Sequence, residues 1–150
     1  MTSAARYLGR IAALSAFASA GCMQQPVHHA LPAPVNVPAS FDRTWAAVID
    51  IFSAGSIPIR TMEKASGLIV AEPLAIGLEM SRRYADCGAG AFGPNVANRA
   101  SYNVRVTGDS TASLVRVTAN FSSTVLGQCT SLGEFERFMM ASIVARATGR

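Results

Sequence analysis

The stretch SYNVRVTGDSTASLVRVTANF, residues 101–121, decides the fold. Apolar and polar side chains alternate on both sides of a Gly-Asp-Ser-Thr turn at residues 108–111. Such alternation is typical of strands with one buried face, and these turn residues favour a reversal of the chain. The stretch therefore predicts an antiparallel hairpin with one face in water. The apolar face carries Tyr102, Val104, Val106, Val115, Val117, Ala119 and Phe121, and the polar face includes Arg105, Arg116, Thr118 and Asn120.

Two amphipathic helices are predicted, one on each side of this hairpin in the sequence. The first begins after Ser40, a good N-cap residue, and ends near Gly55. The second opens with residues 131–134, Ser-Leu-Gly-Glu, which have the form of a capping box, and it ends at Gly149. Each helix has one apolar stripe at helical spacing. The stripes are Phe41, Trp45, Val48, Ile49 and Phe52 in the first helix, and Leu132, Phe135, Met139 and Ile143 in the second.

Further strands are predicted before the central hairpin. Residues 57–63 and 67–72 flank a short turn containing Gly, which favours a second hairpin, and Pro73 ends its second strand. In residues 74–86 a two-residue period of apolar side chains favours a strand, with a helix as the alternative. Residues 35–37, Val-Asn-Val, are a candidate for a short edge strand.

Together these elements predict an α+β fold, an antiparallel sheet of four to five strands with two helices packed on one face. The expected organisation is a signal peptide at residues 1–21, a lipidated cysteine and Pro-rich tether at residues 22–40, and a single domain at residues 41–150. Because both helical stripes would then meet the sheet, Trp45 should be largely buried.

The N-terminal residues have the three-part layout of a secretory signal. Arg6 and Arg10 precede an apolar run at residues 11–20, and small residues separate that run from Cys22. The run has about half of the ~20 residues that a bilayer-spanning helix needs. The residues before Cys22 resemble the lipobox of bacterial lipoproteins, with Ser19 where that pattern usually has Leu.

The lipobox resemblance implies that Cys22 is acylated and becomes the new N-terminus. In that family Asp after the cysteine retains a lipoprotein at the inner membrane, so the Met23 found here implies the outer membrane. The expected partner is therefore the membrane, through a lipid anchor at Cys22, with the domain on the periplasmic face. An ordinary secretory signal, which leaves Cys22 as a free thiol, is the alternative.

Residues 22–40 are predicted to form the tether between anchor and domain. Four of these residues are prolines, which interrupt helices and favour extended backbone. At about 3.1 Å per residue, roughly 18 residues would hold the domain up to ~55 Å from the membrane. His28 and His29 lie in the tether, but no further His or Cys completes a ligand set, so no metal site is expected.

Charge and motifs give no support for catalysis. The formal charge of +4 includes Arg6 and Arg10 of the signal and falls to +2 without them, too little and too scattered for a nucleic-acid site. Residues 88–93 match G-x-G-x-x-G, but Pro94 follows where a nucleotide site needs a helix, so a loop is expected. No Ser-His or Cys-His pair can form in the domain, and no paired acids are evident. We therefore predict no catalytic residue and no cofactor.

Cys87 and Cys129 remain as an even pair of cysteines in the exported chain. In an oxidising compartment such a pair favours a disulfide, which here would join the loop at residues 87–98 to the start of the last helix. Closing a loop of about 40 residues contributes ~4 kcal/mol in the chain-entropy description. Two separate buried thiols are the alternative.

The stretch from Phe41 to Glu72 resembles the helix-grip repeats of a lipoprotein subunit of the β-barrel assembly machinery, and it is similar to many small proteobacterial lipoproteins. The likeness is carried by Trp45, Val48 and Ile49, then by Ile57-Pro58-Ile59 and Ser66-Gly67-Leu68-Ile69. It implies a terminal helix packed across a curved antiparallel sheet. The cysteine pair does not belong to the pattern of that lipoprotein.

The expected function is that of a non-enzymatic cell-envelope lipoprotein, an interaction or assembly module with an envelope protein as partner. The alternative is a periplasmic carrier that holds an apolar or acyl ligand between sheet and helix. An enclosed apolar cavity would distinguish the two, since a packed core leaves few voids larger than a water molecule.

Overall fold

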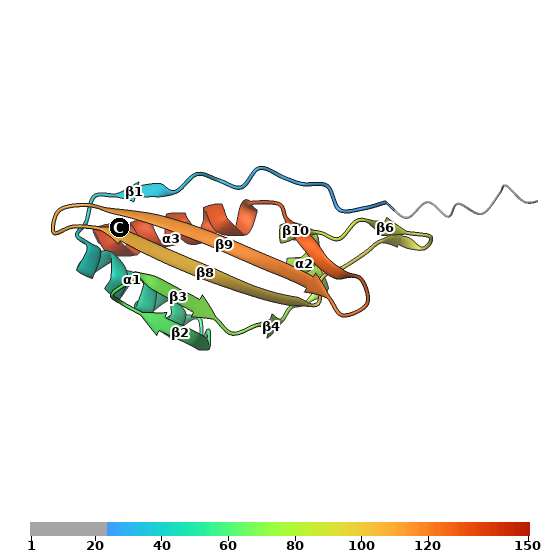
Figure 1. Ribbon diagram of the computed structural model, residues 1–150, viewed down its shortest axis with the longest axis horizontal. Helices are drawn as coiled ribbons and strands as arrows, with labels where there is room; N and C mark the ends of the chain where they lie inside the picture. Colours follow the sequence, from blue (N-terminus) through green and yellow to red (C-terminus); the bar gives the residue numbers. More distant parts are fainter. Residues whose placement is uncertain (1–23) are drawn as a thin grey trace, which may run out of the picture.

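Two long strands, β8 (Arg99–Gly108) and β9 (Ser113–Ser123), run along most of the molecule (Figure 1). They pair antiparallel along their whole length, from Arg99 opposite Ser122 to Gly108 opposite Ser113. This is the hairpin that the alternation at residues 101–121 predicts. At about 3.4 Å per residue, a strand of this length spans ~34 Å.

The computed structural model describes residues 24–150, and within this range three helices pack on a mostly antiparallel sheet of eight strands. The sheet order is β2-β3-β8-β9-β10-β5, with β1 also paired to β9 and β4 to β8, while β6 and β7 form a separate small hairpin. The remaining strands are β1 (Val35–Val37), β2 (Ile59–Glu63), β3 (Leu68–Ala71), β4 (Leu74–Ala75), β5 (Ala85–Asp86), β6 (Ala89–Gly90), β7 (Gly93–Pro94) and β10 (Gly127–Ser131). The helices are α1 (Phe41–Ala54), α2 (Leu78–Tyr84) and α3 (Glu134–Thr148).

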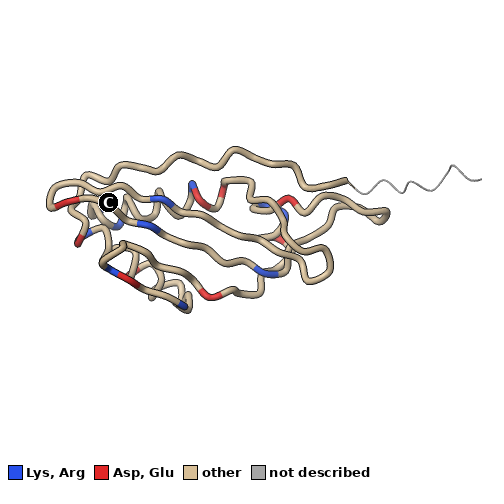
Figure 2. The backbone as a smooth tube through the Cα atoms, in the orientation of Figure 1, with Lys and Arg blue, Asp and Glu red and all other residues tan. Residues whose placement is uncertain are grey.

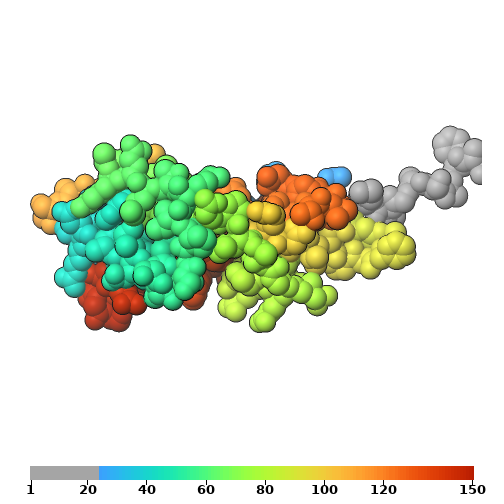
Figure 3. All heavy atoms as spheres, turned by 90° about the horizontal axis from the view of Figure 1, so that it is seen from below, coloured from blue at the N-terminus to red at the C-terminus, as the bar shows by residue number. Residues whose placement is uncertain are grey.

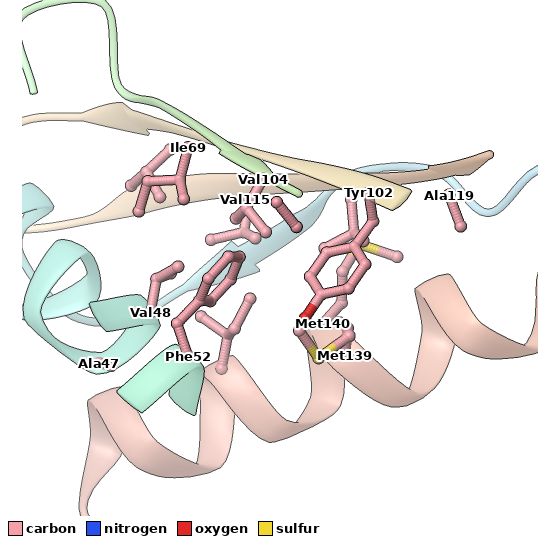
Figure 4. Close-up of a cluster of buried hydrophobic side chains, with 14 of the residues drawn as sticks. Ala47, Val48, Phe52, Ile69, Tyr102, Val104, Val115, Ala119, Met139 and Met140 are labelled. Carbon is pink, nitrogen blue, oxygen red and sulfur yellow. The ribbon is translucent and has the colours of Figure 1, made fainter. Parts of the chain in front are cut away.

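The core lies between the sheet and helices α1 and α3, which also pack against each other. Trp45 is 7% exposed, which confirms that the stripe of α1 is a packing surface, and Val48 and Phe52 are fully buried. Figure 4 shows Val48 and Phe52 from α1, with Met139 and Met140 from α3, pointing toward side chains of the strands. The opposite sheet face is wet, since Arg105, Arg116 and Asn120 are exposed and Thr118 is half-buried.

The class α+β is confirmed, but the predicted number of strands, four to five, is wrong, and so is the predicted number of helices, two. Several strands are too short for a two-residue period to appear in the sequence, among them β4 and β5 with two residues each. The five residues of β10, Gly-Gln-Cys-Thr-Ser, lack apolar alternation and are held by pairing with β9.

Residues 78–84, within the segment 74–86, form the additional helix α2. The strand favoured for these residues is therefore wrong, and the alternative prediction of a helix is correct. The buried residues of α2 are Ser81 and Tyr84, which are three apart, as one face of a helix requires. Glu79 lies in its first turn and two arginines lie in its last turn, which suits the helix dipole.

The predicted capping box at residues 131–134 is also wrong. Helix α3 begins at Glu134 with Gly133 as its N-cap, in the left-handed region at φ 78°, and no side chain caps it. The hydroxyl of Ser131 instead donates to Glu136 at 2.8 Å, and its oxygen accepts from the Gly133 N–H at 3.1 Å. The Ser131 oxygen therefore accepts from the Gly133 N–H and not from the Glu134 N–H that a capping box would use.

Candidate functional site

Of the two chemical sites that the sequence predicts, the structure describes one. Cys87 and Cys129 form the predicted disulfide, with S–S 2.04 Å and Cα–Cα 4.4 Å. Cys22, the predicted lipidation site, lies outside the described residues. The disulfide ties the segment after β5 to β10, next to the point where the described chain begins.

The segment predicted as a tether lies along the domain over its described residues. It follows one edge of the sheet from the β6 end to β1 (Figure 1). Gln24 exchanges two backbone hydrogen bonds with Ala89, both 2.9 Å, and Val35–Val37 pairs with β9. The extended backbone that its prolines favour is thus bound to a sheet edge, because that edge offers unpaired peptide groups. The spacing of ~55 Å predicted from chain length is therefore not available to this segment.

Asp86 fastens this N-terminal segment near the first of its described residues. Its Oδ2 accepts from the Val27 N–H at 3.0 Å, and its Oδ1 accepts from the Gly88 N–H at 2.7 Å. His29 lies beside it, with Nε2 3.7 Å from Asp86 Oδ2. The hydrogen bonds from Val27 and Gly88, with a smaller contribution from His29, hold the pKa of Asp86 below its usual value.

The edge of β9 between β1 and β10 is the part of the sheet that the N-terminal segment covers less closely. A cleft of about 450 Å³ lies there, lined by His28 and His29 on one side and by Thr118–Asn120 and β10 on the other. At this edge the Oε1 of Glu136 accepts from the Ala119 N–H at 3.1 Å. Glu136 is fully buried, and it satisfies one backbone donor of β9 that has no partner strand.

The sequence analysis missed Glu136, although its signal is visible. Glu136 lies four residues before Met140 and seven before Ile143, and all three are buried on the same face of α3. An acidic residue within an apolar stripe indicates a buried polar contact, since a carboxylate without a partner is costly to bury. Leu132, which the helical spacing assigns to that stripe, precedes the helix.

A second, apolar cleft lies between the sheet, the segment from β4 to α2, and α3. Its volume is about 110 Å³. Its floor is formed by Tyr102 and Phe121 of the sheet with Phe135 of α3, and Met80 and Leu74 are exposed at its rim. Tyr102 and Phe135 are in contact, with ring centroids 5.0 Å apart. Burial raises the pKa of the Tyr102 phenol, so the phenol is neutral at ordinary pH.

The wet sheet face carries one unusual charge pair. Arg105 and Arg116 are directly opposite each other on β8 and β9. Like charges in this position repel, and within residues 24–150 neither arginine has a salt-bridge partner. The pair gives an otherwise neutral stretch of this face a local positive charge.

Comparison with known proteins identifies no relative, since the sequence matches no protein-family model and no curated protein at a significant level. Within the described residues, no helix combines the length and apolar character that crossing a membrane requires. The same residues contain no group of three or more His, Cys, Asp or Glu side chains placed to hold a metal ion.

Proposed function

We propose that this chain is a lipid-anchored protein of the outer membrane, without catalytic activity, whose domain binds a protein partner on the periplasmic side. The observation that carries the interaction role is the size of the apolar cleft, about 110 Å³. Pockets that enclose small-molecule ligands usually measure about 300–1,000 Å³, and a cavity of about 150 Å³ holds a ligand no larger than about benzene. The cleft therefore fits one apolar side chain of a partner and not an acyl chain.

The anchor is supported by the sequence from Arg6 to Met23, which has the order basic, apolar, small, cysteine. The helix-grip resemblance supports an assembly role, and the packing of α1 and α3 on one sheet face agrees with it in outline. The exposed pair Arg105 and Arg116 offers the partner a second, polar contact on the other face.

The anchor is tested by Cys22→Ser in the full-length chain. Removal of the acyl chains should release the protein from membranes, because each buried CH₂ contributes about 0.8 kcal/mol to anchoring. The protein should move from the outer-membrane fraction to the soluble periplasmic fraction. Labelled fatty acid that still follows the Cys22→Ser protein, or wild-type protein in the inner-membrane fraction, would contradict this part of the proposal.

The cleft is tested by a photoreactive residue in place of Met80, at the rim, in intact envelopes. We expect a crosslink to one protein that disappears when Ala100→Leu fills the cleft. The control places the same group at Leu114 on the wet face, where Ala100→Leu should change nothing. A fatty acid that copurifies in equal amount with the protein, and is lost with Ala100→Leu, would favour the carrier alternative.

A further inference from the structure

The end of the molecule at which the described chain begins carries exposed apolar side chains. Phe92, in the turn between β6 and β7, is 106% exposed, so its whole ring lies in solvent. Val125 and Leu126, in the turn between β9 and β10, are also exposed. Figure 1 places both turns at the same end, and Figure 3 shows the β6–β7 hairpin as its outermost part. Exposed apolar residues gathered in this way mark an interaction surface.

The apolar turn lies next to the predicted anchor. Gln24 is hydrogen-bonded twice to Ala89 of β6, and Cys22 is two residues earlier in the chain. Two residues reach at most about 7 Å. An acyl chain on Cys22 would therefore bring the lipid surface to the β6–β7 hairpin, and not to the far end where α1 lies.

The hairpin is also suited to a lipid surface by its charge. Residues 87–98 contain no acidic or basic side chain, and neither does the turn at residues 123–131. Figure 2 shows the whole tip without Lys, Arg, Asp or Glu. A charged group would resist transfer into the apolar boundary of the bilayer, whereas Phe is among the residues found on the apolar faces of interfacial segments.

The hairpin is held firmly enough to present its ring in one direction. The Asn95 N–H donates to the Gly88 oxygen at 2.9 Å, and the disulfide at Cys87 fixes its base to β10. Gly88 has φ +72°, and a Cβ there would overlap the Gln24 oxygen, so the start of the chain and the hairpin fit closely.

We propose that the β6–β7 hairpin inserts Phe92 into the lipid interface beside the acylated Cys22, so that the domain stands end-on on the membrane. This rests on the proposed anchor. The apolar cleft and the wet sheet face then point away from the lipid, where a partner can reach them. This holds although the N-terminal segment lies along the domain and does not act as a spacer between domain and membrane.

The experiment uses the full lipidated chain, carrying Phe92→Trp, reconstituted in phosphatidylethanolamine and phosphatidylglycerol vesicles. Acyl-brominated phosphatidylcholine in the vesicles quenches tryptophans that enter the lipid. We expect a blue shift and loss of most of the emission from the introduced tryptophan. Trp45 is buried in α1 and supplies a constant background. The matched control is Phe138→Trp on α3, where Phe138 is 58% exposed, and its emission should stay unquenched.

Failure of this inference and failure of the anchor give different results. Intact mass of the mature chain reports acylation of Cys22 directly, and a chain without acyl groups overturns both proposals. An acylated chain whose Phe92→Trp emission is no more quenched than the control overturns the insertion alone. A photoreactive residue at Phe92 that crosslinks to a protein in envelopes, and not to phospholipid, overturns it in favour of a protein-docking surface.

Discussion

The two ends of the molecule are stabilised by different means. The helical end, formed by α1, the C-terminal half of α3 and the β2–β3 and β8–β9 turns, is held by large apolar side chains from α1, α3 and the sheet. The hairpin end, formed by β5–β7, β10, α2 and residues 24–27, buries fewer apolar side chains, Tyr84 among them, and is also held by a disulfide and by hydrogen bonds to Asp86 and Ala89. Phe92 and Val125 are exposed at this second end.

The two ends lie at opposite ends of β8 and β9 and differ in their main role. The helical end mainly stabilises the fold, and the hairpin end mainly presents apolar side chains for binding. Burial of apolar area is the main source of stability at the helical end, where the exposed groups offered to a partner are the polar Arg105 and Arg116. A disulfide and a few polar contacts fix the hairpin end while its apolar side chains stay free for another surface. The two ends should therefore respond to substitution as differently as their contacts indicate.

The largest effect is expected at the helical end, from Trp45→Ala. Loss of a buried aromatic side chain leaves a cavity and costs about 3–5 kcal/mol, which is a large share of the stability of a typical domain, about 5–15 kcal/mol. The melting temperature should fall steeply or the fold should be lost. Phe138→Ala on the exposed face of α3 is the control and should change little. An unchanged melting temperature in Trp45→Ala would mean that the α1 stripe is a binding surface.

The next effect is expected at the hairpin end, from Cys87→Ser with Cys129→Ser. The disulfide spans 42 residues, and loss of such a crosslink costs up to about 4 kcal/mol of unfolding free energy in the chain-entropy description. Urea unfolding measures this total. Amide exchange should show the first loss of protection in β5–β7 and β10, while the centre of β8–β9 stays protected.

This second prediction has an outcome that would remove the contrast between the ends. If the exported wild-type protein shows both thiols free by mass spectrometry, the hairpin end is not held covalently. Equal loss of protection at both ends in the double variant would show that the disulfide stabilises the whole fold and not one region.

The sequence predicts the helical end better than the hairpin end, for the same physical reason. The apolar stripes of α1 and α3 and the alternation at residues 101–121 are repeated patterns, and they predict these two helices and the central hairpin correctly. The turn containing Gly predicts the β2–β3 hairpin correctly. The contacts of the hairpin end occur once each. Nothing periodic marks Gln24 as the partner of Ala89, or Asp86 as the acceptor for Val27, so the sequence predicts a free tether.

The candidate sites divide in the same way. The pairing of Cys87 and Cys129 follows from the even pair that remains once Cys22 is assigned to the anchor of an exported chain, whereas the apolar cleft depends on where α2 lies beside the sheet. That placement cannot be foreseen when residues 78–84 are interpreted as a strand. Phe92 is visible in the sequence as an apolar residue in a loop, but only the position of Gln24 relates it to the anchor.

The smallest effect on stability is expected from lowering the pH. Each end of the molecule has one carboxylate whose protonation can be followed. At the hairpin end, the hydrogen bonds from the Val27 and Gly88 amides lower the pKa of Asp86 from its usual 3.8. At the helical end, contacts from the Thr111 hydroxyl and amide lower the pKa of Asp109 in the β8–β9 turn. A carboxylate with a lowered folded pKa contributes stability that is fully present above the unfolded pKa and is lost as pH falls through the folded value. Both contributions should therefore hold at neutral pH and disappear below about pH 3.8.

Protonation of the two carboxylates should free different parts of the chain. Protonation of Asp109 frees only the turn at residues 109–112, because its acceptor bonds go to Thr111 and Ala112. Protonation of Asp86 frees the Val27 amide and loosens the N-terminal segment from the hairpin. Amide chemical shifts followed from about pH 7 to about pH 2 should show Val27 and Gly88 moving together, and Asp86→Asn should abolish that transition while leaving the Thr111 transition in place. If Val27 and Gly88 show no acid transition of their own, Asp86 does not fasten the segment, and the start of the chain is held at the hairpin by Gln24 and Ala89 alone.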